Sequence, residues 1–259
     1  MKNLCNISAV IISILLGQAV ADTDSHHEKW RCGVPDLTLD EVGRSRLEVE
    51  SFWADNATRD NDPVYILVAW HVVYSSTGEG NISDASIQSA VDKLNDTFNE
   101  PFNYYFTLGT VDRTMNDDWY LFEQNEEANQ SEDEQEMRQA LQIDPVHYYN
   151  IYSIKTEVHD GYITMGWNYY PMYIPENSIW QGTTVNWQAA NYSGQTITHE
   201  CGHYFGLLHT FQGGCSGGDA VDDTPDQDDG DNIYECNESL DTCPNDPGND
   251  PVHNIMNYS

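Results

Sequence analysis

The most constraining feature of this sequence is the segment His199–His209, which reads HECGHYFGLLH. Residues four positions apart lie on the same face of an α-helix, so His199 and His203 can bind one metal ion. Gly206 can adopt the left-handed conformation that ends a helix, and the turn can bring His209 back as a third ligand. Three histidines leave one position of a tetrahedral zinc ion open for water, which is typical of catalytic zinc sites.

Glu200 directly follows the first of these histidines. From there its carboxylate can take a proton from a zinc-bound water molecule as that water attacks a carbonyl group. The alternative is that three histidines share one helix by chance, and the short pattern HExxH does have false positives. The glycine and the third histidine at fixed offsets favour a zinc site in which Glu200 is the general base.

The acidic composition limits the classes of partner. The 259 residues include 43 Asp and Glu but only 10 Lys and Arg, which gives a formal net charge of −33. This charge repels nucleic acid phosphates and anionic lipids, so neither nucleic acid nor a membrane surface is expected as a partner. The length suits one well-buried domain with flanking segments.

Residues 1–21 are predicted to be a secretory signal peptide. Lys2 supplies a positive charge, residues 9–16 form an apolar stretch, and Ala19-Val20-Ala21 resembles a cleavage site. The stretch is too short to span a bilayer, so the chain is expected to be secreted and extracellular. Sequons for N-linked glycans, consistent with a glycoprotein, occur at Asn56, Asn81, Asn95, Asn129, Asn191 and Asn237.

Residues 22–62 are predicted to be a polar, irregular pro-segment. They contain the segment Trp30–Asp36, WRCGVPD, which resembles the cysteine switch of matrix metalloproteinase pro-segments. In such a zymogen the thiolate of Cys32 would occupy the open zinc position, because thiolate is a good zinc ligand. The alternative is a disulfide, since removal of the signal peptide leaves five cysteines: Cys32, Cys201, Cys215, Cys236 and Cys243.

Hydrophobic periodicity predicts the main secondary structure. We expect strands at residues 64–74, 104–111, 148–154 and 161–167 from their β-branched and aromatic content. Helices are expected after Ser83 or Asp84, which can cap the first helix, and at residues 134–142. On the histidine helix, Cys201 lies opposite the histidines and is expected to be a free, buried thiol.

Several blocks of sequence together resemble the pappalysin family of metzincin proteases. They are Asn81–Gln88, Val111–Thr114, His199–His209, Thr210–Cys215, Asp222–Pro225 and Asp250–Ser259. The resemblance implies an α+β catalytic domain over residues 63–259, with a twisted mixed sheet, a backing helix and an active-site helix. It also implies a zinc-dependent endopeptidase that hydrolyses protein or peptide substrates.

The resemblance assigns further residues. Met256 would be the methionine of the Met-turn below the metal site, and Tyr258 would stabilise the oxyanion. A disulfide is implied between Cys215 and Cys243. In the family the chain continues past the Met-turn with a cysteine and a helix, so either this sequence is truncated at Ser259 or the C-terminal subdomain is cut short after the Met-turn. The alternative function is therefore a catalytically impaired secreted protein that binds calcium or a partner and keeps the upper subdomain.

The acidic segment 219–231 is dense in the hard oxygen ligands that calcium prefers. Relatives bind calcium near the matching Asp-Asp-Thr-Pro sequence, which makes Asp219, Asp222, Asp223 and Thr224 candidate calcium ligands. The alternative is a solvated charged loop, the usual fate of acidic stretches. The sequence favours neither interpretation.

Overall fold

The computed structural model describes residues 29–34, 38, 40–41, 43, 62–100, 102–121, 131–156, 158–159, 162–190 and 195–259. The predicted signal peptide and most of the predicted pro-segment lie outside these residues, as do the sequons at Asn56, Asn129 and Asn191. Within the described part, none of the helices combines the length and the apolar character needed to cross a membrane.

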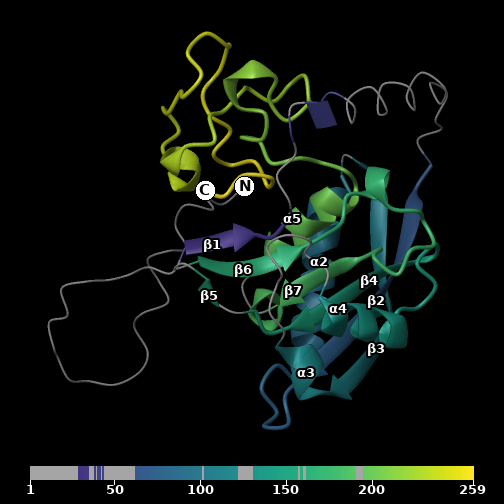
Figure 1. Cartoon of the computed structure of the whole chain (residues 1–259). Helices are drawn as coiled ribbons and strands as arrows, with labels where there is room; N and C mark the ends of the chain where they lie inside the picture. The colour runs from purple at the N-terminus through teal and green to yellow at the C-terminus, as the bar shows by residue number, and fades with distance from the viewer. Residues whose placement is uncertain are drawn as a thin grey trace, which may run out of the picture.

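The described strands form one seven-stranded mixed sheet (Figure 1). They are β1 (Lys29–Cys32), β2 (Val64–Tyr74), β3 (Tyr104–Met115), β4 (Tyr148–Ile154), β5 (Val158–His159), β6 (Tyr162–Trp167) and β7 (Thr183–Asn186). Their order is β1-β6-β7-β4-β2-β3, and β5 pairs with β6. The pairs β2–β3, β2–β4, β4–β7 and β1–β6 are parallel, whereas β6 is antiparallel to β7.

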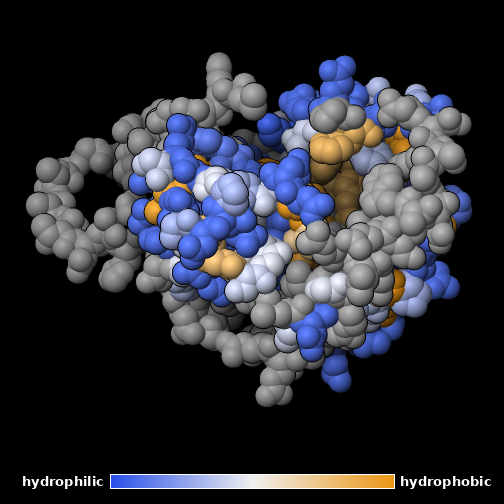
Figure 2. Space-filling model, turned by 90° about the horizontal axis from the view of Figure 1, so that it is seen from above, coloured by the Kyte–Doolittle hydropathy of each residue, from blue (hydrophilic) through white to orange (hydrophobic). Residues whose placement is uncertain are grey.

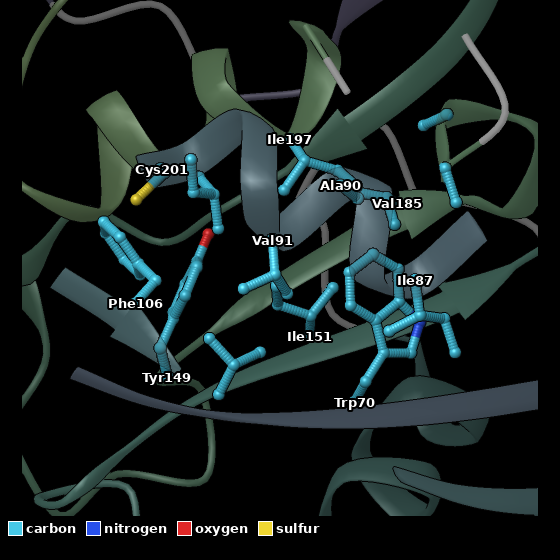
Figure 3. Packing of buried hydrophobic residues seen from close by; sticks show 14 of the residues in the cluster. Trp70, Ile87, Ala90, Val91, Phe106, Tyr149, Ile151, Val185, Ile197 and Cys201 are labelled. Atoms are coloured by element: carbon cyan, nitrogen blue, oxygen red, sulfur yellow. The ribbon is translucent and has the colours of Figure 1, made fainter. Parts of the chain in front are cut away.

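Helices α2 (Asp84–Phe98) and α5 (Gln195–Tyr204) pack on one face of the sheet and enclose the larger core (Figure 3). Alternate residues of β2, namely Val68, Trp70 and Val72, belong to this core because successive side chains of a strand face opposite sides. Ser83 caps α2 by accepting a hydrogen bond from the main chain of Ser86. Helix α2 is therefore the expected backing helix, with its apolar stripe against the sheet.

Helices α3 (Asp117–Tyr120) and α4 (Glu132–Leu141) belong to a second core on the opposite face. Val73 of β2 and Tyr152 of β4 supply its sheet side, and Met137 of α4 covers them. Because both faces are buried in β2 from Val68 to Val73 and in β4 from Tyr149 to Ile154, these strands are rich in apolar and aromatic residues on both faces. The α+β fold with a mixed sheet, a backing helix and an active-site helix is confirmed.

The structure corrects two sequence-based expectations. Residues 22–62 were expected to be irregular, but Lys29–Cys32 form a strand that pairs with β6. The connection after residue 167 contains the further strand β7, inserted between β6 and β4. Both segments are short and become strands through pairing with partners that are distant in the sequence. Helix α4 also begins earlier than expected, because Ser131 caps it.

The C-terminal part of the chain lies above the sheet and α5, and is drawn in green to yellow in Figure 1. Its helical elements are single 3-10 turns, at Gly214–Ser216 and Asp231–Tyr234. The expected disulfide between Cys215 and Cys243 ties this part together, with the two Cα atoms 5.3 Å apart. In Figure 2 hydrophilic residues (blue) cover much of the coloured surface seen from above, and a hydrophobic area (orange) is exposed toward the right.

The sequon residue Asn95 has a structural role that we expect to exclude a glycan. Its amide donates to the main-chain oxygens of Val91 and Phe106 and accepts from the main-chain nitrogen of Phe106, at 2.8–3.1 Å. A glycan on this nitrogen would disrupt the link between α2 and β3. Asn95→Ala should lower the free energy of unfolding by roughly 1–3 kcal/mol in urea titrations, since buried partners lose their hydrogen bonds.

Asn237→Ala is the matched control for this experiment. Asn237 is also a sequon asparagine, but it is exposed and its side chain accepts only from Ser239, two residues away. We expect its substitution to change the free energy of unfolding by less than about 0.5 kcal/mol. Equal effects of the two variants, or a glycopeptide at Asn95 in the folded secreted protein, would contradict the assigned role of Asn95.

Candidate metal centre and active site

The local geometry of α5 brings the three histidines of the motif together. His199 and His203 lie one turn apart on the helix, which ends at Tyr204. Gly206 follows with a φ of +90°, which a residue with a Cβ rarely adopts. The main-chain nitrogens of Gly206 and Leu207 donate to the oxygens of His203 and Gly202, so the helix closes with a Schellman motif. The chain then turns back and carries His209 to the first two histidines.

The Nε2 atoms of the three imidazoles converge. His203 Nε2 lies 3.1 Å from the Nε2 atoms of both His199 and His209, and all three side chains are buried. Burial lowers the pKa of His199 to about 4. Burial together with the neighbouring imidazoles holds the pKa values of His203 and His209 well below the usual range. The three rings are therefore uncharged at neutral pH.

Hydrogen bonds from the other ring nitrogens fix the tautomers of two of these histidines. His199 Nδ1 donates to the main-chain oxygen of Ile255, and His203 Nδ1 donates to that of Leu207, each at 2.7 Å. Their Nε2 atoms then carry lone pairs that point toward one another, an arrangement that calls for a cation between them. A tetrahedral zinc ion with bonds of about 2.0–2.1 Å would hold its nitrogens roughly 3.3 Å apart. The donor set therefore fits zinc.

Cys32 joins the same group of ligand atoms. Its sulfur and one nitrogen from each histidine all lie within 4.8 Å of one another, and the four residues are buried. The hydroxyl of Tyr258 accepts from the main-chain nitrogen of Cys32 at 3.2 Å and donates to its main-chain oxygen at 3.3 Å. Gly33 then donates to the main-chain oxygen of Gly166 on β6. The main chain of this segment is thus bonded to Tyr258 and to β6, and the thiol of Cys32 lies beside the three histidines.

Glu200 lies on α5 between the metal-ligand candidates and strand β6. Its Oε2 atom accepts from the amide of Asn168 at 3.0 Å, and its Oε1 atom has no hydrogen-bond partner among the described residues. Burial raises the pKa of Glu200 to about 8, although the thiol of Cys32 and the amide of Asn168, both beside the carboxylate, oppose the rise. A Cβ atom at Gly166 would lie 2.8 Å from Glu200 Cγ, so this glycine makes room for the glutamate.

The loop around Met256 packs directly below the histidine helix. A Cβ atom at Gly202 would lie 2.3 Å from the sulfur of Met256, so the methionine contacts the helix between its two histidines. Asn254 supports the loop by accepting from the main-chain nitrogen of Met256 at 2.9 Å. Met256 therefore lies against the histidine helix, and its role as the Met-turn methionine stays a prediction from the family resemblance.

The candidate calcium ligands do not form a comparable group. Asp219 is buried and accepts from the main chain of Val221, while Asp222 and Asp223 are exposed. In the part of the chain that the structure describes, the cluster around Cys32 is the one place where three or more ligating side chains of His, Cys, Asp or Glu converge. Calcium binding near Thr224 therefore stays a prediction from the sequence.

The remaining cysteines separate into two states. Cys201 is free and buried in the core, as expected from its position on the helix. Cys236 is disulfide-bonded.

Comparison with known proteins now identifies the family. The sequence model described as Pregnancy-associated plasma protein-A matches residues 131–259. An extracellular metalloprotease of Colletotrichum graminicola is 31% identical over 98% of this chain and 90% of its own length. An extracellular metalloprotease of Neurospora crassa is 36% identical over 76% of this chain and 68% of its own length. The chain belongs to this pappalysin family of metzincin metalloendopeptidases.

Solved structures support the same fold. Mature mirolysin of Tannerella forsythia, in complex with a cleaved peptide, is 25% identical, with a TM-score of 0.59 over 76% of this chain and 84% of its own. A mutant of promirolysin from the same organism is 23% identical, with a TM-score of 0.65 over 88% of this chain and 86% of its own. Because its sequence identity is below 25%, the similarity to promirolysin supports the fold alone.

Sequence reasoning missed two residues of this pappalysin site, Asn168 and Gly166. Both flank Glu200 in space, but they lie more than thirty positions before it in the chain. A buried asparagine directly after a strand carries no spacing signal that would connect it with a distant helix. Only the pairing of β6 with β7 and the packing of both strands against α5 bring these residues together.

From the lowered pKa values of the buried histidines, we predict that acid destabilises the metal-free protein. His199 titrates near 6.5 in the unfolded chain but at about 4 in the folded one, so the unfolded state binds protons more readily. This contribution to stability is present above about pH 6.5 and is lost as the pH falls toward 4. The melting temperature of chelator-treated protein should fall over that range.

The titration of Glu200 also makes stability depend on pH, so the control must remove this contribution. Its pKa is raised to about 8, so its contribution to stability is present at low pH and is lost as the pH rises through 8. The experiment should therefore use the Glu200→Gln background, with and without His199→Gln. The decline in melting temperature should be smaller when His199 is also replaced. Identical pH profiles of the two proteins would contradict the assignment.

Proposed function

We propose that this chain is an extracellular zinc endopeptidase made as a latent precursor. His199, His203 and His209 hold the zinc, Glu200 is the general base and Tyr258 stabilises the oxyanion. The observation that carries the proposal is the convergence of the three uncharged imidazoles, two of them from α5, the helix that also carries Glu200. The alternative, a binding protein that has lost catalysis, is not favoured, since every residue of the motif is present and assembled.

Zinc, when bound, would act as a Lewis acid that makes water nucleophilic at neutral pH and polarises the scissile carbonyl. Glu200 would accept the proton of the attacking water at Oε1, the oxygen that has no partner among the described residues. Its environment raises its pKa, so it can also hold that proton and pass it to the leaving amine.

Tyr258 is suited to donate a hydrogen bond to the oxyanion. Burial raises the pKa of its phenol well above the usual value, so the hydroxyl keeps its proton. Its ring packs against those of His199 and His209, with centroids 6.0 and 4.9 Å away. In this structure the hydroxyl is engaged by the main chain of Cys32, which prevents it from serving a substrate.

We infer that β1 keeps the precursor inactive, because it occupies positions that a substrate would need. The strand pairs with β6, the sulfur of Cys32 lies within 4.8 Å of the three histidine ligand nitrogens, and the main chain of Cys32 bonds the hydroxyl of Tyr258. An extended peptide substrate would need the same strand edge, the same metal position and the same tyrosine. The pro-segment within residues 22–62 would thus block binding and chemistry together until it is removed.

Substrates are proposed to be proteins or peptides outside the cell. The related fungal proteins are named extracellular metalloproteases, and the N-terminal 21 residues have the features of a signal peptide. Mature mirolysin is described in complex with a cleaved peptide, which fits a peptide substrate for this chain also. The net charge of −33 favours basic substrates over acidic ones.

The first test replaces Glu200. The activated Glu200→Gln variant should bind one zinc ion per chain but hydrolyse casein at least about a thousandfold more slowly, because the ligands remain and the base is lost. Metal content is measured by mass spectrometry and turnover by release of labelled peptides. Turnover close to that of the wild type would show that Glu200 is not the base.

The second test separates the two contacts of Cys32. In the secreted precursor, Cys32→Ser should be active without organomercurial treatment, because a hydroxyl is a much poorer zinc ligand than a thiolate. It should remain slower than protein cleaved between about residues 40 and 62, because β1 still pairs with β6 and its main chain still holds Tyr258. A wild-type precursor as active as the serine variant would exclude the proposed switch.

A further inference from the structure

The proposed mechanism leaves open how the glutamate that serves as base is aimed. A glutamate side chain has three rotatable bonds, and a general base must hold one oxygen within hydrogen-bond reach of the proton that it accepts. In this chain the carboxylate of Glu200 is fully buried and touches a neighbour that neither the zinc motif nor the proposed chemistry requires. That neighbour is Asn168, the residue that directly follows β6.

Asn168 makes two contacts with Glu200. Its amide nitrogen lies 3.0 Å from Oε2 and 2.7 Å from the main-chain oxygen of Glu200. A main-chain oxygen can only accept, so the nitrogen of the amide must face it, and this fixes which way the amide points. One NH₂ group therefore ties the carboxylate of Glu200 to its own backbone.

The orientation of Asn168 is fixed from behind by two hydroxyl groups. Thr183 Oγ1 on β7 donates to Asn168 Oδ1, so it must accept from its second neighbour, the hydroxyl of Tyr149 on β4. Burial raises the pKa of Tyr149 well above its usual value, so this hydroxyl keeps the proton that it donates. The donors thus run in one direction, from Tyr149 to Thr183 to Asn168 to Glu200.

The backbone of β6 closes the other side of the carboxylate. A Cβ atom at Gly166 would lie 2.8 Å from Cγ and 3.0 Å from Oε1 of Glu200, so the glutamate packs against bare backbone there. With Oε2 held by Asn168, Oε1 is the oxygen left without a partner among the described residues. The side chain is therefore confined between β6 and the amide.

We propose that Asn168 is a positioning residue that aims the carboxylate of Glu200, and that Thr183 and Tyr149 hold Asn168 in the required orientation. The inference rests on the proposed function of Glu200 as the base. Asn168 is held behind the carboxylate and touches none of the reacting atoms. Its loss should therefore lower kcat, leave KM nearly unchanged and leave the zinc content unchanged.

The most informative variants act through Thr183, because they leave Asn168 and Glu200 in place. Thr183→Val removes the hydroxyl at nearly constant volume, and we expect kcat of the activated zinc enzyme to fall by about tenfold. Thr183→Ser restores the hydroxyl and should return kcat to within about twofold of the wild type. Rescue by serine would not be expected if the loss came from the packing of the threonine methyl group.

Thr156→Val is the matched control. Thr156 Oγ1 also bonds a buried asparagine, accepting from Asn186 at the end of β7, but neither residue contacts Glu200. The same chemical deletion is thus made beside the same strand without touching the proposed chain of donors. Thr156→Val should keep kcat within about twofold of the wild type.

A second readout does not depend on activity. In a crystal structure of the metal-free Asn168→Ala protein after removal of residues 22–62, and hence of the Cys32 thiol beside the carboxylate, the carboxylate of Glu200 should leave its wild-type position or occupy more than one rotamer. The proposal is overturned if the carboxylate stays in place in this variant. It is also overturned if Thr183→Val keeps the wild-type kcat, or if Thr156→Val loses as much as Thr183→Val.

Failure of the proposed function would look different. In that case the wild-type protein would load zinc but hydrolyse no peptide, even after removal of residues 22–62. That result would contradict the role of Glu200 as base. The crystallographic comparison would still report whether Asn168 sets the orientation of Glu200. A displaced carboxylate supports the positioning contact, and an unmoved carboxylate rejects it.

Discussion

The site depends above all on the hydrogen bonds that fix the histidine tautomers. His199 and His203 donate from Nδ1 to main-chain oxygens of Ile255 and Leu207, which leaves their Nε2 lone pairs free to face a cation. One acceptor comes from the turn after the helix and the other from the loop around Met256. Formation of the metal centre therefore requires that the C-terminal part of the chain is folded against α5, so the geometry of the site and the packing of this part arise together.

Strand β6 gives the site its second support. On one edge it pairs with β7 and thereby joins the sheet, and on the other it accepts β1 of the predicted pro-segment. Gly166 lets Glu200 pack against its backbone, and Asn168, directly after the strand, binds the same carboxylate. The strand that pairs with the predicted pro-segment is therefore also the strand against which Glu200 packs.

The parts of this architecture that could be predicted from the sequence are those encoded by local spacing. The spacing of His199, His203 and Gly206 within one motif predicts a helix and its end, and β2 and β4 are long enough to be recognised by composition. Strands β1 and β7 are only four residues long and are stabilised by distant partners. The contact between Asn168 and Glu200 depends on the order of strands in the sheet, which no local pattern specifies.

Charge balance connects latency with catalysis. Metal-free, the site holds uncharged imidazoles and a glutamate whose pKa of about 8 leaves it mostly protonated at neutral pH, so little charge is buried. In the proposed zinc form, a divalent cation would be balanced by two anions, the thiolate of Cys32 and the carboxylate of Glu200. In the proposed activation, release of β1 would remove one of these anions and free the hydroxyl of Tyr258 at the same time. The cleft would then have an excess of positive charge and an available donor, the environment that favours negative charge developing on a peptide carbonyl oxygen.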